Sequence, residues 1–255
     1  MSLSGDVILD VLAKPKHEVF LLFADQAALR HFGVVSASES RASQRLREHE
    51  QRPPSLFPEM DADERRSLQE RATRSERSLA ATQAAATKIL NAALRGSHWL
   101  ARVEASPPGG RRRAFLTLYR EMLFEQATRV LEIPMMNADG VHIYSLLHAT
   151  KSAKGYVAMK EAVEHALAHS PLPAAVVDDM RSRLRVAVES VARLVLERHA
   201  EQEVRWAESR GDRGAHSVRQ TALEDTEIFP FQLGELKESL KTYRLPGRTI
   251  RYRLP

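Results

Sequence analysis

The feature that most constrains this chain is a pair of short apolar runs followed by an amphipathic segment, between residues 128 and 163. The runs cover residues 130–135 and 141–149 and carry β-branched or aromatic side chains. Asn137-Ala138-Asp139-Gly140 joins them and is typical of a tight reversal, with positive φ tolerated at the glycine. Helical spacing then takes over, at Tyr156, Met159, Lys160, Val163 and Leu167. The sequence therefore predicts a β-hairpin that runs into a helix.

A second strand is expected upstream, at residues 18–23. This run is apolar at nearly every position, which is typical of a central strand that is covered on both faces. A helix over residues 24–32, closed by Gly33, is expected to follow. A central strand needs neighbours on both sides, yet only residues 1–17 precede this one.

The remaining segments predict mostly helices. A capping-box pattern at Asp61 and Glu64 predicts a helix over residues 61–94 with a thin apolar stripe, after a polar stretch at residues 36–58. A turn at residues 107–110 precedes a helix that leads into the hairpin. One long helix is expected over residues 174–207, then a linker at 208–219. A small helix at 233–243 and a basic strand at 249–254 end the chain as a winged helix ends.

Composition limits the function classes. The 255 residues carry a formal net charge of +5, which is compatible with a polyanionic partner. The absence of cysteine excludes disulfides, thiol chemistry and cysteine-based zinc sites. Apolar runs are too short for a membrane span, and Asp6 and Asp10 interrupt any signal peptide. We expect a cytoplasmic protein with no membrane partner.

No strong catalytic motif is present, so the catalytic residues are unknown and the assignment as an enzyme stays open. His142 and His148 share one strand face, where a metal site and a packed or hydrogen-bonded pair are the alternatives. The second is favoured because no acidic residue is adjacent in sequence. His165 and His169 are four residues apart on a helix, and a surface position is favoured over zinc binding. No metal site is expected.

Several basic groups are candidates for binding phosphates. Arg111–113 follow a turn, where a solvated loop is the alternative interpretation. Lys151 and Lys154 lie where a helix opens, and free backbone N–H groups favour anions there. Alternating arginines on the expected wing would suit a nucleic-acid groove, although many such wings only pack. The candidate nucleic-acid-binding residues are Lys151, Lys154, Arg244, Arg248, Arg251 and Arg253.

The hairpin and its helix resemble a segment of the three-Cys-motif partner proteins (TcmP). The pattern "YyLlhaT-x-x-x-kG-x-x-x-Mk" of that family is matched by Tyr144, Leu146, His148, Thr150, Gly155, Met159 and Lys160. Residues 18–32, with Arg30, resemble the strand and helix that precede this segment. The passage 94–99 is similar to a short "fG-x-x-W" motif, and residues 225–255 are similar to the family's winged-helix-like ending.

The resemblance implies an α/β, mostly helical fold. It would hold a partial methyltransferase-type sheet of about three strands with long helices, plus a small C-terminal winged-helix-like unit. The third strand would lie antiparallel between the other two. Residues 1–169 would form the α/β region, with a helical insertion at 36–127, and residues 170–255 the long helix, linker and winged-helix-like region. The half that holds adenosylmethionine in this family has no counterpart here, so no cofactor-binding residue carries over.

Two functional hypotheses follow. The first is a TcmP-like, catalytically incomplete methyltransferase-like module that binds nucleic acid or a protein partner. That protein, or a second copy, would pair with the open edge of the strand at residues 18–23. The alternative is the C-terminal half of a split adenosylmethionine-dependent methyltransferase, active only with its N-terminal half. We expect no cofactor in the isolated chain and S-adenosylmethionine only in a completed assembly.

Overall fold

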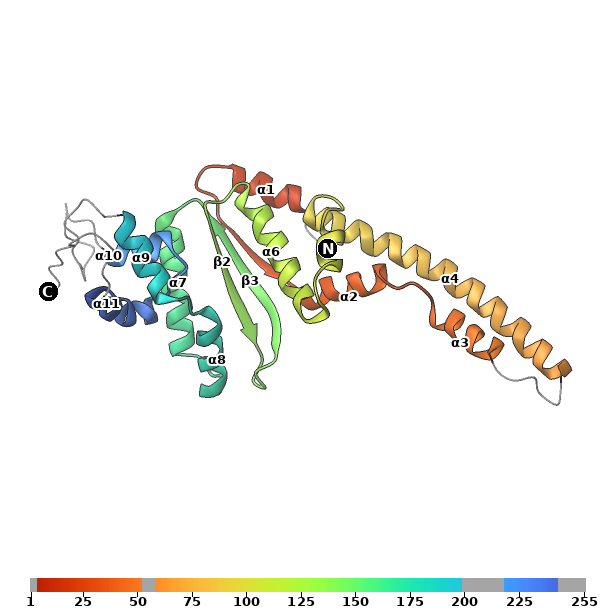
Figure 1. Cartoon of the computed structure of the whole chain (residues 1–255). Helices are drawn as coiled ribbons and strands as arrows, with labels where there is room; N and C mark the ends of the chain where they lie inside the picture. Colours follow the sequence, from red (N-terminus) through yellow and green to blue (C-terminus); the bar gives the residue numbers. More distant parts are fainter. Residues whose placement is uncertain (1–3, 52–57, 199–217, 243–255) are drawn as a thin grey trace. The chain divides into compact units, whose positions relative to one another are not determined.

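The computed structural model describes residues 4–51, 58–198 and 218–242, and in these parts the chain is mostly helical with one small sheet. The chain divides into two compact units. The first comprises residues 1–9 and 24–122, and the second residues 10–23 and 123–255. Most of the expected helical insertion at 36–127 belongs to the first unit, and the whole sheet belongs to the second (Figure 1).

The sheet has three strands, and their order agrees with the expected one. The strands are β1 (Val19–Phe23), β2 (Arg129–Met136) and β3 (His142–Thr150). β3 lies in the middle and pairs antiparallel with both neighbours. The hairpin turn has Gly140 at a φ of +73°, and the Asn137 side-chain oxygen accepts hydrogen bonds from the backbone N–H groups of Asp139 and Val141. The predicted hairpin and its turn are therefore confirmed.

β1 departs from the prediction of a strand covered on both faces. Phe20 and Leu22 are 53% and 60% exposed, whereas Val19 is buried. Within the part of the chain that the structure describes, β1 pairs only with β3 and forms an edge of the sheet. An apolar run has the same sequence pattern in a covered central strand and in an uncovered edge strand. The pattern therefore could not distinguish the two, and the prediction was wrong.

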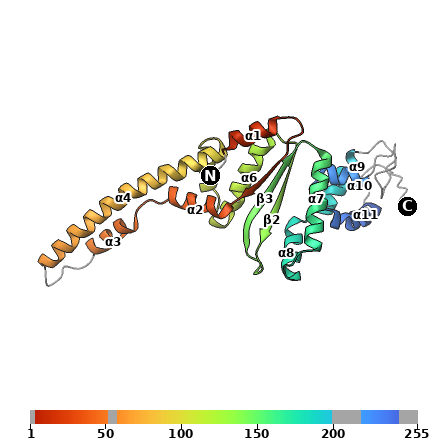
Figure 2. The ribbon, with the colours of Figure 1, turned by 180° about the vertical axis from the view of Figure 1, so that it is seen from behind.

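Helices α7 (Ala153–Ala168) and α8 (Ala174–Leu184) lie along the β2 side of the sheet in both views (Figures 1 and 2). The predicted positions Tyr156, Val163 and Leu167 face a buried apolar cluster that includes Leu131 and Ile133 of β2. The predicted helix after the hairpin is confirmed. Ser152 caps it, because its hydroxyl accepts a hydrogen bond from the backbone N–H of Gly155.

The single helix expected over residues 174–207 is wrong. α8 ends at Leu184 and α9 (Val188–Arg198) begins after an extended Arg185. Both backbone groups of Val186 bond to the Gln232 amide, and the Arg185 guanidinium binds the Glu235 carboxylate. Contacts with a distant segment, invisible in the local pattern, stabilise the break. Residues 199–207 lie outside the described part.

The C-terminal region contains a second buried cluster. Helices α9, α10 (Val218–Asp225) and α11 (Leu233–Thr242) supply most of its side chains, among them Val195, Leu223 and Leu236. α11 confirms the helix expected at 233–243 to within one residue. α10 was not predicted, since its first residues fell in the expected linker. The basic strand at 249–254 lies outside the described residues.

The first unit is built from helices. α4 (Pro58–Leu94) confirms the long predicted helix, but it begins before Asp61, so Asp61 is not its N-cap. A helix at Arg41–Glu50 (α3) was not predicted, because its apolar pattern is weak. Ser40 caps this helix, since its hydroxyl accepts a hydrogen bond from the backbone N–H of Ser43. Its remaining elements, some shared with the second unit, are α1 (Gly5–Ala13), α2 (Asp25–Val35), α5 (Trp99–Glu104), a short 3-10 helix at Pro108–Gly110 and α6 (Arg111–Phe124).

Candidate functional site

One hydrogen-bonded network ties β1 to β3 and to the start of α7. The Glu18 carboxylate lies 3.0 Å from His148 Nε2 and accepts a hydrogen bond from the Thr150 hydroxyl at 2.9 Å. The Thr150 hydroxyl in turn accepts the backbone N–H of Ser152 at 2.8 Å. No acidic residue is adjacent to His148 in sequence, but antiparallel pairing brings Glu18 to it from 130 residues away. The favoured interpretation of a packed, hydrogen-bonded histidine holds for His148, which is 1% exposed.

Gly155 makes this network compact. A Cβ at Gly155 would lie 2.0 Å from the nearer carboxylate oxygen of Glu18, far inside van der Waals contact. The glycine therefore lets the first turn of α7 approach the carboxylate closely, and an anion near a helix N-terminus is stabilised by the helix dipole. The network fixes the loop between β3 and α7, which carries the predicted candidates Lys151 and Lys154.

The structure brings further lysines to these two. The Lys151 ammonium donates a hydrogen bond to the backbone carbonyl of Ala13 at 3.2 Å, which places it beside the loop between α1 and β1. That loop carries Lys14 and Lys16, whereas Lys151 comes just before α7 and Lys154 is in the first turn of that helix. We call Lys14, Lys16, Lys151 and Lys154 the lysine cluster. All four are exposed.

The lysine cluster is positively charged and open to a ligand. Among the described residues, the amino groups of Lys14, Lys16 and Lys154 have no hydrogen-bond or ion-pair partner. With the neighbouring Glu18 the cluster carries a net charge of +3, from four lysines and one glutamate. Lys16 holds its loop in a left-handed turn at a φ of +64°, and His17 Nδ1 lies 3.0 Å from the Pro15 carbonyl. The loop is thus held in a defined shape.

Sequence reasoning found half of this cluster. Lys151 and Lys154 were predicted from the helix start, but Lys14 and Lys16 were not singled out. The predicted strand order contained the missing signal. Once the strand at 18–23 is placed beside the strand at 141–149, the residues before the first strand must lie next to the residues after the second.

A buried lysine lies on the same helix. Lys160 is fully buried, and its ammonium donates hydrogen bonds to the carbonyls of Leu223 at 2.7 Å and Thr226 at 2.5 Å. It also lies 4.2 Å from the centre of the Tyr156 ring, within cation–π range. Burial lowers the pKa of Lys160 to about 7, against an opposing effect of the Glu227 carboxylate. Lys160 thus attaches α7 to the end of α10.

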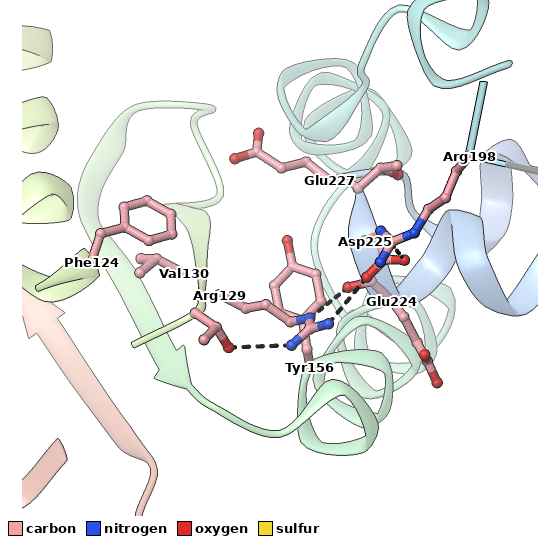
Figure 3. Close-up of a pocket in the computed structure, with 10 residues that line it drawn as sticks. Phe124, Arg129, Val130, Tyr156, Arg198, Glu224, Asp225 and Glu227 are labelled. Atoms are coloured by element: carbon pink, nitrogen blue, oxygen red, sulfur yellow. Dashed lines mark hydrogen bonds and ion pairs between the residues drawn. The ribbon is translucent and has the colours of Figure 1, made fainter. Parts of the chain in front are cut away.

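A cavity of about 490 Å³ adjoins this attachment (Figure 3). The Arg129 guanidinium crosses it, donating to the Glu224 carbonyl at 2.6 Å and to the Asp225 carboxylate at 3.1 Å. Arg198 approaches the second Asp225 oxygen at 2.6 Å. The lining holds two arginines and three carboxylates, a formal net charge of −1, and both guanidinium groups are bonded to Asp225, so the cavity does not favour an anion. Its ten lining residues are Phe124, Thr128, Arg129, Val130, Tyr156, Arg198, Glu224, Asp225, Thr226 and Glu227.

The other predicted sites are dispersed. Arg111–113 form the first turn of α6 and not a loop, and the Arg111 guanidinium lies 5.0 Å from the Phe32 ring centre. His142 Nε2 lies 3.3 Å from the Ser145 hydroxyl, as expected for a hydrogen-bonded histidine. His165 and His169 are exposed, and their rings lie 4.2 Å apart. The predicted wing residues Arg244, Arg248, Arg251 and Arg253 lie outside the described residues.

Metal and membrane features were sought in the described parts. There, no group of three or more histidine, aspartate and glutamate side chains is arranged to hold a metal ion. None of the described helices combines the length and apolar character that a membrane crossing requires. In the comparisons with known proteins, no family model, curated protein or solved structure matches this chain.

Proposed function

We propose that this chain binds nucleic acid, and that the lysine cluster contacts the phosphate backbone. The observation that carries the proposal is the hydrogen bond from Lys151 to the Ala13 carbonyl, because it joins two lysine-bearing segments into one surface. Lysine ammonium groups bind phosphates as point charges and read no base sequence. The expected binding is therefore strongly dependent on salt and weakly dependent on sequence. Arg244, Arg248, Arg251 and Arg253, which lie outside the described residues, stay candidate contacts from the sequence alone.

The proposal is tested by fluorescence anisotropy with labelled 20-nucleotide DNA and RNA, single- and double-stranded, between 25 and 200 mM KCl. Replacing the four lysines of the cluster by glutamine should weaken binding about tenfold or more at low salt, since each lysine that binds a phosphate also releases a counterion. The slope of log affinity against log salt should become shallower by roughly 0.9 for each phosphate that the variant leaves unneutralised.

A charge-matched control separates the cluster from general basicity. Helix α4 carries four exposed cations that have no ion-pair partner among the described residues, and their replacement by glutamine removes the same charge. This control should retain affinity within about threefold. Absence of binding by the unchanged protein at 25 mM KCl, or equal weakening in both variants, would overturn the proposal. The control positions are Arg66, Arg74, Arg77 and Lys88.

We further propose that the sheet is the rear part of a methyltransferase-type sheet and that the isolated chain is catalytically incomplete. The strand order supports this, since β3 lies antiparallel between β1 and β2 as the TcmP resemblance implies. The alternative is the C-terminal half of a split methyltransferase. Titration calorimetry with S-adenosylmethionine distinguishes both of these hypotheses from an intact methyltransferase. No heat of binding is expected for the isolated chain, and tight binding would contradict both.

A further inference from the structure

The outer edge of β1 has the composition of a strand that pairs with another strand. Its five residues, Val-Phe-Leu-Leu-Phe, include no charge, proline or glycine. Edge strands of soluble proteins usually carry such residues, because they prevent pairing with other chains. β1 also exposes two large apolar side chains on one face, Phe20 and Leu22, next to this edge. An unprotected edge and exposed apolar side chains therefore coincide.

The sequence of β1 is complementary to itself in the antiparallel direction. A two-fold axis at Leu21 would place Phe20 opposite Leu22 of the second copy and Leu22 opposite its Phe20. Directly opposed residues in an antiparallel pair share one face, so the exposed side chains of both copies would form one apolar strip. Val19 would face Phe23 in the same way. No like charges would meet along the paired strands.

We infer that a second copy of this chain pairs with β1, with Leu21 at the two-fold axis, to form a continuous six-stranded sheet. Such an interface uses the same surface on both copies and has two-fold symmetry, which is the commonest symmetry of homodimers. The inference is independent of the nucleic-acid proposal. Its tests measure association of the protein with itself, and the lysine-cluster variant should associate as the unchanged protein does.

Cysteine cross-linking tests the register directly. The chain contains no cysteine, so a Leu21→Cys variant forms a disulfide only between two copies. Directly opposed residues in an antiparallel pair have Cα atoms about 4.5–5.5 Å apart, which is within the range for a disulfide. Mild oxidation at 10 µM protein should convert most of this variant to a covalent dimer. The control Ile143→Cys, also in the sheet and 45% exposed but away from the β1 edge, should form no covalent dimer under the same oxidation.

Charged residues introduced on β1 provide a second test. The substitutions should leave the fold intact, because Phe20 and Leu22 are exposed. The double variant Phe20→Lys/Leu22→Lys and the double variant Phe20→Glu/Leu22→Glu should each sediment as monomers, since like charges would oppose one another. An equimolar mixture should recover the dimer, since lysines then face glutamates. Two results would overturn the inference: the unchanged protein is monomeric at 100 µM, or the lysine variant and the glutamate variant each form dimers on their own.

Discussion

Two regions of helix α7 use lysine in opposite ways. At its start, Lys151 and Lys154 are exposed beside the Glu18 network. In its middle, Lys160 is fully buried and bonded to two backbone carbonyls. The difference shows that burial and bonding decide what a lysine does: the exposed pair is accessible to a ligand, whereas the buried one holds two helices together. Sequence spacing alone gives both kinds the same appearance.

The largest expected effect comes from Lys160→Ala. This change leaves the carbonyls of Leu223 and Thr226 without their donor and opens a space beside Tyr156. The free energy of unfolding should fall by about 3–5 kcal/mol, as when one partner of a buried polar contact is removed. Urea denaturation followed by circular dichroism measures it. A decrease below about 1 kcal/mol would show that Lys160 does not hold α7 to α10.

The next effect is a dependence of stability on pH. The pKa of Lys160 is about 7 in the fold and 10.5 in the unfolded chain, so between these values the unfolded chain binds more protons. Stability should therefore rise with pH above about 7 and fall to its lower limit below 7. Between pH 7 and 9 the rise should approach about 2–3 kcal/mol.

The matched control for this dependence is Lys160→Met, in which the rise between pH 7 and 9 should disappear while the other groups titrate unchanged. The range stops at pH 9 to avoid a contribution from Tyr119. Burial raises the pKa of Tyr119 to about 12, so above about pH 10 it ionises more readily in the unfolded chain and stability falls. Parallel urea curves at each pH provide the measurement. Identical slopes in both proteins would refute the assignment to Lys160.

A smaller effect is expected at the start of α7. Gly155→Ala places a methyl group on the Glu18 carboxylate and should displace it from His148 and Thr150, at a cost of about 2 kcal/mol. In a Glu18→Ala background the same change should cost much less, because the obstructing carboxylate is gone. A double-mutant cycle by urea denaturation measures this coupling. Strictly additive effects would mean that the two residues do not interact.

The smallest effect on stability is expected for the exposed lysines. Lys154→Gln should change the free energy of unfolding by no more than about 0.5 kcal/mol, as for other exposed side chains without partners. The same variant should nevertheless weaken binding to DNA or RNA measurably at low salt. Thermal denaturation and fluorescence anisotropy on one preparation separate the two properties. A large decrease in the free energy of unfolding would show that Lys154, like Lys160, stabilises the fold, which would contradict its assignment as a freely exposed lysine.

The hairpin, its turn and α7 were predicted from sequence because their signals are local. Asn137 and Gly140 specify the turn through their own side chain and backbone, and the apolar runs on either side of it specify the strands. The helix spacing from Tyr156 to Leu167 indicates which face is buried. The strand order came from a resemblance, and the structure agrees with it.

The candidate site was predicted only in part, for the opposite reason. Lys151 and Lys154 lie at a helix start that the sequence indicates, but Lys14, Lys16 and Glu18 join them only through the pairing of β1 with β3. The exposure of Phe20 was likewise missed, because an apolar run does not indicate whether a neighbouring strand is present.

The sequence by itself determined the hairpin, the helix that follows it and the position of the long helix α4, because each depends on residues within a few turns of one another. Tertiary structure alone decided the break between α8 and α9, the burial of Lys160 and the union of the lysine cluster. Each of these depends on hydrogen bonds between residues about 50 to 140 positions apart, and no local pattern encodes such partners.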